Sequence, residues 1–308
     1  MDVMIQKKKT QRKNRIKRQH LLEFLCIVPA VITILALYYY PIVELLRISF
    51  TNWNLIKPEY EYVGLENWKW LFENITKNHV LQDFVTTVKY TAGHLAIVLI
   101  GGLLLALLFQ RDGKLFGFMR TVTFVPYYIG MASIALIFLV MLNENYGIVN
   151  HILQACGLEK VGWLTKSGWA LAILIIMASW KTIGYNMMIY LSAMKGVSSS
   201  YYEAAKVDGA TKVDIFFRIT LPMIAPTTVF LLITQFLSSM RVYAAADVLT
   251  KGGPYRATEV MVYQIYTMAF DDFRIDRASV VSLVFFLFLM IVTIFMMFIT
   301  EKKTNYDA

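Results

Sequence analysis

Long runs without charged side chains constrain this chain more than any other feature. Five stretches of at least 20 residues contain no Asp, Glu, Lys or Arg, and a sixth contains only Lys181. About 20 apolar residues cross a bilayer as a helix, which bonds its backbone polar groups internally. The sequence therefore predicts an all-α membrane protein with six transmembrane helices. The runs are Phe24–Val43, Tyr90–Gln110, Thr121–Asn143, Trp169–Met194, Ile219–Met240 and Ala278–Thr300.

Prolines lie inside three of these runs, at Pro29, Pro126 and Pro226. Membrane helices tolerate proline better than soluble helices do, because neighbouring groups satisfy the freed backbone atoms. We expect the fifth helix to begin after Pro226. Residues Ile219–Ala225 would then belong to the preceding loop.

The composition excludes the other broad classes of protein. Of the 308 residues, 57% are hydrophobic and 17% are charged, and the mean hydropathy is +0.54. A soluble domain has about 25% charged residues. The two cysteines, Cys26 and Cys156, are too few for a disulfide-stapled fold and have no metal-binding spacing. We expect no metal site.

Basic residues cluster before the first apolar run. Residues 1–20 contain eight of the 30 Lys and Arg. Such a cluster can bind nucleic acid, but directly before a membrane span it indicates a cytoplasmic tail. With both termini inside, the inner segments hold 17 Lys and Arg and the outer segments nine. Without the tail the counts are equal, so the predicted orientation depends on the tail.

The segment between the fourth and fifth runs contains two helix starts. Ser200 and Glu203 fit a capping box, and Thr211 and Asp214 fit a weaker version of it. Between them, Asp208-Gly209 is a turn or helix-end signal. At about 30 residues, the segment is much longer than the usual helix–helix connection of about 2–8. We expect two short cytoplasmic helices with a bend near Gly209, and a function for them.

This segment also matches a family motif. Glu203-Ala204-Ala205, Gly209 and Ile219-Thr220-Leu221-Pro222 fit E-A-A-x3-G-x9-I-x-L-P at every stated position. It resembles the EAA loop of permease subunits of binding-protein-dependent ABC importers. The resemblance implies the type-1 transmembrane fold of these importers. It also implies a coupling loop, residues 198–222, that docks on a cytoplasmic ATPase.

A second stretch resembles the maltose- and glycerol-phosphate-type sugar permeases, and more narrowly the first permease of those heterodimers. It comprises residues 249–254, Ala257-Thr258-Glu259, residues 263–266 and Ala269-Phe270. Family members often carry Gly-Tyr-Ala before the last span, where this chain has Asp276-Arg277-Ala278. The resemblance suggests four parts. They are a basic tail at 1–20, a first helix with an external segment at 21–83, the transmembrane domain at 84–300, and a cytoplasmic end at 301–308.

The resemblance implies roles for the motif residues. Glu203 would face the ATPase; it could also cap its own helix through Ser200, and both roles can hold together. Small Ala204 and Ala205 would allow close approach, although alanine also simply favours helix. Gly209 would supply a bend that requires positive φ. The predicted coupling residues are Glu203, Ala204, Ala205, Asp208, Gly209, Ile219, Leu221 and Pro222.

Polar and aromatic residues in the later spans are candidates for a solute path. Polar groups in membranes are costly and tend to face a bundle interior or cavity. Aromatics beside amides and hydroxyls suit a sugar, but the same residues could form bonds between helices. Lys181 could pair with a carboxylate or extend to an interface, and His94 more simply donates a helix-to-helix bond. The candidates are Trp180, Tyr185, Asn186, Gln235, Ser238, Ser239, Arg241 and Tyr243.

The chain lacks a Walker sequence, a G-x-S-x-G elbow and an H-E-x-x-H motif. We therefore expect a non-enzymatic protein. The resemblance implies a multi-pass protein of a bacterial cell membrane that imports a sugar or oligosaccharide, and the basic tail predicts that both termini are cytoplasmic. The resemblance also implies its partners: a second permease, two ATPase subunits carrying ATP and Mg, and an extracytoplasmic binding protein. The alternatives are import of a polyol such as glycerol phosphate, or a stand-alone secondary transporter or channel.

Overall fold

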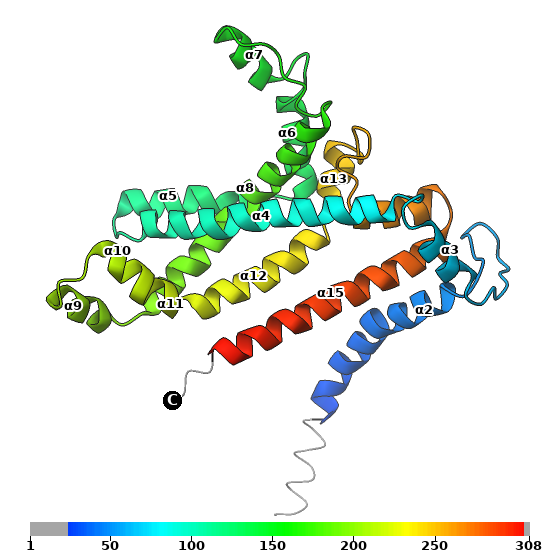
Figure 1. Ribbon diagram of the computed structural model, residues 1–308, viewed down its shortest axis with the longest axis horizontal. Helices are drawn as coiled ribbons and strands as arrows, with labels where there is room; N and C mark the ends of the chain where they lie inside the picture. Colours follow the sequence, from blue (N-terminus) through cyan, green and yellow to red (C-terminus); the bar gives the residue numbers. More distant parts are fainter. Residues whose placement is uncertain (1–23, 305–308) are drawn as a thin grey trace, which may run out of the picture.

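The computed structural model describes residues 24–304 (Figure 1). The basic tail predicted at residues 1–20 lies outside the described residues, as do residues 305–308. The described chain is mostly helical and includes no strand, apart from an isolated antiparallel bridge between Thr51 and Tyr62. The four-part division drawn from the sequence remains a prediction.

Among the described residues, four helices are long and apolar enough to cross a membrane. Two further pairs of helices meet the same criterion only as pairs, because each pair is sharply bent at a short break. Counting each bent pair as one span gives six, the number that the sequence predicts. The four helices are Phe24–Ile48 (containing η1, Leu35–Tyr39, and α2, Tyr40–Ile48), α4 (Val80–Phe109), α8 (Ser167–Gly196), and the Ile275–Phe298 part of α15 (Ile275–Thr304).

The expectation of one continuous helix over Thr121–Asn143 is wrong. The chain forms α5 (Lys114–Phe124), a 3₁₀ turn η2 (Val125–Tyr128) and α6 (Met131–Met141). The two parts of this bent pair meet at 101°. Pro126 lies at the start of η2 and has no N–H to donate, and Ile129 is extended with ψ 136°. The third apolar run is therefore a broken span.

The fifth run is also bent, near the place that the sequence indicates. A π-helical turn η3 (Phe216–Thr220) and α11 (Leu221–Met223) precede α12 (Ala225–Met240). The helices on the two sides of Ile224 differ in direction by 61°. α12 begins two residues before the predicted start, with Pro226 in its first turn, where a missing N–H is tolerated.

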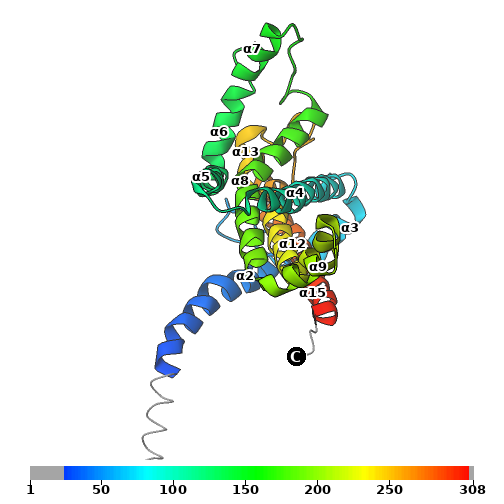
Figure 2. The same ribbon diagram turned by 90° about the vertical axis from the view of Figure 1, so that its left-hand side faces the viewer.

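Close packing of α4 against α8 forms the centre of the molecule, and α12 packs beside them (Figure 2). Gly102 of α4 makes this approach possible. A Cβ atom there would lie 2.8 Å from Asn186 Cβ and 3.3 Å from the Met187 backbone nitrogen. Small residues at helix crossings are the usual means of close packing in membranes.

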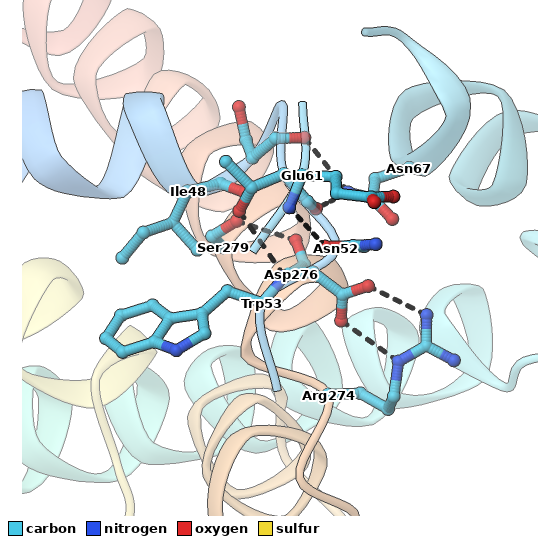
Figure 3. Close-up of polar contacts among 10 residues, drawn as sticks. Ile48, Asn52, Trp53, Glu61, Asn67, Arg274, Asp276 and Ser279 are labelled. Carbon is cyan, nitrogen blue, oxygen red and sulfur yellow. Dashed lines mark hydrogen bonds and ion pairs between the residues drawn. The ribbon is translucent and has the colours of Figure 1, made fainter. Parts of the chain in front are cut away.

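At the end of the molecule where α4 begins, a segment after α2 is fastened to the start of α15 (Figure 3). Asn67, on α3 (Glu66–Asn74), donates to the carbonyls of Ser49 at 3.1 Å and Thr51 at 2.8 Å. The Asp276 N–H donates to the Trp53 carbonyl at 3.3 Å. The Asp276 carboxylate accepts two bonds from Arg274, at 3.0 and 2.8 Å.

These contacts give the departure from Gly-Tyr-Ala a structural role. Asp276 is buried, with 2% of its surface exposed. The Arg277 guanidinium lies over the Trp70 ring at 4.6 Å. Both residues therefore join the start of α15 to the segment between α2 and α4.

The opposite end of α4 faces the two short helices α9 (Ser199–Val207) and α10 (Lys212–Ile215) (Figure 1). The remaining elements are α7 (Ile148–Ala155), α13 (Ala244–Leu249), α14 (Met261–Tyr266) and the π-turn η4 (Thr267–Asp271). Bonds from Arg256 to Asp83 and from Gln264 to the Asn78 carbonyl tie the segment around α14 to the first turn of α4 and the residues before it. The α9–α10 loop and this tied region thus occupy opposite ends of the long helices.

Candidate functional site

The α9 helix begins two residues before the predicted start. Ser198 is its N-cap, and the Ser198 side chain accepts a bond from the Ser200 N–H at 3.4 Å. The capping box predicted for Ser200 and Glu203 is therefore wrong, because Ser200 already lies inside the first turn. Glu203 is exposed, so its carboxylate is available to a partner.

The bend after α9 is a Schellman motif centred on Gly209. The Gly209 N–H donates to the Lys206 carbonyl at 3.1 Å, and the Ala210 N–H donates to the Ala205 carbonyl at 2.9 Å. These are the two bonds that define this helix ending. Gly209 has φ +78°, as predicted from the sequence, and a Cβ there would meet no atom within 4 Å. The requirement for glycine is thus one of backbone conformation, not space.

The second helix start is confirmed. The Thr211 side chain accepts a bond from the Asp214 N–H at 3.2 Å, and Asp214 accepts one from the Thr211 N–H at 3.1 Å. An exposed ion pair of 3.8 Å joins Asp214 to Arg218 one turn later. α10 therefore starts in a fixed direction immediately after the bend.

The predicted coupling residues divide into exposed and packed groups. Ile219 and Leu221 are half-buried, whereas Pro222 is exposed in the first turn of α11. Ala205 is half-buried on the inner side of α9. The four on the outer surface of the bend are Glu203, Ala204, Asp208 and Gly209.

A cavity of about 330 Å³ lies between α4, α6, α8, α12 and the start of α13. Four predicted path residues line it, namely Ser238, Ser239, Arg241 and Tyr243. Sequence reasoning missed Tyr90, Met131 and Thr182 as lining residues, because nothing in the local sequence links α4, α6 and α8. His94 also lines the cavity.

His94 forms the helix-to-helix bond expected from the sequence. Its Nδ1 lies 3.1 Å from the Ser179 Oγ on α8, and its ring stacks on Tyr90 at 5.9 Å. The Gln235 side chain on α12 bonds to the same imidazole. His94 therefore connects three helices at the wall of the cavity.

The other four predicted path residues do not line this cavity. Trp180 is exposed and contacts Phe138, and Tyr185 stacks on Tyr127 at 4.8 Å. Asn186 is fully buried and donates to the Thr182 carbonyl of its own helix at 3.0 Å. The structure thus groups four of the eight predicted path residues around one cavity and places Gln235 behind its wall.

Tyr243 provides a hydroxyl immediately before the first residue of α13. Its ring lies 4.9 Å from Tyr266 and 6.2 Å from Tyr263. Burial, then a hydrogen bond with Tyr266 and the nearby Asp247, raise the pKa of Tyr243 to about 12. The phenol is therefore protonated at neutral pH and can both donate and accept a hydrogen bond. Within the described residues, no group of three or more His, Cys, Asp or Glu could hold a metal ion.

Comparison with known proteins identifies the family. Residues 98–305 match the family described as "Binding-protein-dependent transport system inner membrane component". The chain belongs to this family. It is a multi-pass membrane component of a transport system, and its family is one of permeases, not of enzymes.

Relatives of this permease cover nearly its whole length. The probable ABC transporter permease protein YurN of Bacillus subtilis (strain 168) is 31% identical over 87% of this chain and 92% of its own. The sn-glycerol-3-phosphate transport system permease protein UgpA of Salmonella choleraesuis (strain SC-B67) is 29% identical over 94% and 97%.

A solved structure shows the same fold. A chain of a bacterial alginate ABC transporter, in complex with an alginate pentasaccharide-bound periplasmic protein, matches with a TM-score of 0.82 and 25% identity. The match covers 95% of this permease and 98% of that chain. The predicted type-1 importer fold and the family resemblance are therefore confirmed.

Proposed function

We propose that this permease is the transmembrane subunit of an ATP-driven importer for a sugar or oligosaccharide delivered by an extracytoplasmic binding protein. The observation that supports this most is the α9–α10 loop. It combines the full E-A-A-x3-G-x9-I-x-L-P pattern with a fixed bend at one end of the long helices. Glu203, Ala204 and Asp208 are exposed there and form a surface to which a partner protein can bind.

An ATPase is the partner proposed for this surface. Two ATPase subunits would bind ATP and Mg, one beneath this chain and one beneath a second, similar permease. Because the bend is fixed by the Schellman motif and the Thr211–Asp214 box, a movement of the ATPase would reach the spans through α10 and α11 without being absorbed in the loop. The two permeases would then alternate between an inward-open and an outward-open state. ATP or solute would shift the balance between these states by binding one of them more tightly than the other.

The cavity between α4, α8 and α12 is the proposed part of this permease in the solute path. It offers hydroxyls from Ser238, Ser239 and Thr182 beside the Tyr243 ring. Sugars need both, because their hydroxyls require hydrogen-bond partners and their ring faces are apolar. UgpA transports sn-glycerol-3-phosphate by its name, and the related transporter structure holds an alginate pentasaccharide on its periplasmic protein.

A phosphorylated polyol is the second candidate solute. The Arg241 side chain lines the cavity, and its guanidinium suits a phosphate or carboxylate group. Its Nε donates to the Leu237 carbonyl at 3.1 Å, which leaves the other guanidinium nitrogens for a solute.

The chain would lie in a bacterial cell membrane with α9–α10 and both termini in the cytoplasm. The support is the basic run at residues 1–20, which the positive-inside rule places on the cytoplasmic side. The opposite end of the long helices, around Asp83, Arg256 and Asp276, would then face the binding protein.

The decisive experiment is purification of the tagged chain from its native membrane in mild detergent, followed by mass spectrometry and by uptake assays in vesicles. We expect an ATPase and a second permease to copurify, and sugar uptake to require ATP and the binding protein. A single chain that moves solute without ATP would contradict the proposal and favour a stand-alone carrier or channel.

A further inference from the structure

A side chain of another helix holds the break in the third span. Lys181 lies in the middle of α8 and is half-buried. Its Nζ donates to the Tyr127 carbonyl and to the Ile129 carbonyl, each at 2.6 Å. The same Nζ lies 5.4 Å from the centre of the Tyr127 ring. None of the ion pairs among the described residues includes Lys181, so its main partners are backbone carbonyls.

These two carbonyls are ones that the break deprives of helical partners. Tyr127 lies in the 3₁₀ turn η2, and Ile129 is the extended residue between η2 and α6. A helix end leaves its last carbonyls without internal donors, and hydrocarbon supplies none. Non-helical backbone at membrane depth is tolerated only where protein or water satisfies it. Lys181 supplies the donors from the neighbouring helix.

Two further residues of α8, Gly184 and Tyr185, pack against the same break. A Cβ at Gly184 would overlap the Thr123 carbonyl and would lie 2.8 Å from Phe124 Cα. These are backbone atoms that cannot move aside cheaply. Tyr185 stacks on Tyr127 with ring centres 4.8 Å apart. Gly184 and Tyr185 follow Lys181 by three and four residues, so each is next to Lys181 on the surface of α8.

The break stands at the edge of the solute cavity. Met131, the first residue of α6, lines the cavity of about 330 Å³ from one side. Thr182, the neighbour of Lys181, lines it from α8. The bonds of Lys181 therefore set where α6 starts relative to α8 at the cavity wall.

We propose that Lys181 is a positioning residue for transport, which fixes the broken span against α8 so that Met131 forms the cavity wall. This proposal rests on the proposed function in treating the cavity as part of the solute path. Lys181 acts through the backbone of Tyr127 and Ile129, without touching the solute.

The transport test uses the whole transporter in vesicles, with Cys26 and Cys156 replaced by Ser. Lys181→Met keeps the length of the side chain and removes its donors. Lys181→Arg keeps donors, and Lys89→Met is the control at an exposed lysine of α4. We expect Lys181→Met to reduce uptake per assembled transporter about tenfold, equivalent to about 1.4 kcal/mol. It should also change the KM for solute, while Lys181→Arg retains most activity and Lys89→Met all of it.

Chemical rescue distinguishes the loss of the hydrogen-bond donors of Lys181 from the loss of side-chain volume. Lys181→Cys is treated with an aminoethyl thiosulfonate, which restores an ammonium, or with the neutral ethyl reagent of similar length. Restoration of uptake by the aminoethyl reagent alone supports the proposal. Restoration by both reagents or by neither overturns it, as does normal uptake per transporter in Lys181→Met, even where that variant accumulates poorly.

A measurement without transport keeps this proposal separate from the proposed function. Spin labels at Met131→Cys and Thr182→Cys report the distance across the cavity wall. We expect Lys181→Met, but not Lys89→Met, to shift or broaden that distance. An unchanged distance would overturn the positioning role. Failure of the unaltered transporter to take up solute would instead count against the proposed function.

Discussion

At the scale of single residues, Gly209 determines whether the α9–α10 loop keeps its shape. Its φ of +78° belongs to the left-handed region, which costs a residue with a side chain about 1–2 kcal/mol. Since no atom lies within 4 Å of a Cβ there, the cost of a substitution is conformational. A substitution would therefore destabilise the two Schellman hydrogen bonds, which fix the angle between α9 and α10.

We predict that Gly209→Leu uncouples the transporter. Uptake should fall severalfold while the amount of protein in the membrane and the ATPase activity of the purified complex persist, because only the bend is destabilised. Gly209→Asn is the matched control, since asparagine tolerates the left-handed region better than other residues with side chains. Normal uptake by Gly209→Leu would show that the bend does not transmit force.

Arg256 offers a second residue-scale test, of stability. Its Nη2 lies 2.8 Å from both the Asp83 carboxylate, which is fully buried, and the Glu259 carboxylate. Removing one partner of a buried ion pair costs about 3–5 kcal/mol, because a charge is left without compensation. Arg256 has φ +61°, so the substitution must also tolerate the left-handed region.

We predict that Arg256→Asn clearly lowers the thermal unfolding midpoint of the purified protein in detergent. Lys251→Asn is the control, because Lys251 also has positive φ, in the same loop, but is exposed. The ion pair would be dispensable if both variants unfolded at the same temperature.

At the scale of elements, the spans and the bend near Pro226 were predictable, whereas the break after Tyr128 was not. Apolar runs reveal a span because the bilayer requires about 20 apolar residues wherever a helix crosses it. The Thr211–Asp214 box and the Gly209 bend were also readable, since each depends on residues five or fewer apart. The break after Tyr128 is held by Lys181, which is 54 residues from Tyr127 along the chain, and His94 meets Ser179 85 residues away. No local pattern reports such contacts.

Helix α3 is an element whose attachment can be tested by one side chain. Asn67 is buried, with 5% exposure, and its amide bridges the carbonyls of Ser49 and Thr51 (Figure 3). Leaving buried polar groups unsatisfied costs about 1–3 kcal/mol each. We predict that Asn67→Ala speeds hydrogen exchange of the backbone amides in residues 49–63 and leaves those of α8 unchanged. Lys69→Ala, at an exposed position of the same helix, should change neither; equal exchange in both variants would refute the bridging role.

At the scale of the whole molecule, the α9–α10 loop and the region around Asp276 lie at opposite ends of the long helices (Figure 1). The proposed orientation places the first end in the cytoplasm and the second outside. Without residues 1–20, the Lys and Arg counts of the two sides are equal, so charge within the described part does not decide the matter. An experiment on intact cells is required, and the chain supplies a suitable probe in Cys156, which is free and exposed after α7.

We predict that a membrane-impermeant maleimide labels Cys156 in intact cells, or in cells stripped of any outer membrane, when Cys26 is replaced by Ser. A cysteine placed at Ser199, in the first turn of α9, should react only after the inner membrane is permeabilised, in a chain that also carries Cys156→Ser. Both positions are exposed, so access to the reagent, not burial, controls the rate. The opposite result would be labelling of Ser199→Cys before permeabilisation and no labelling of Cys156 until after it. That result would invert the predicted orientation and place the coupling loop out of reach of a cytoplasmic ATPase.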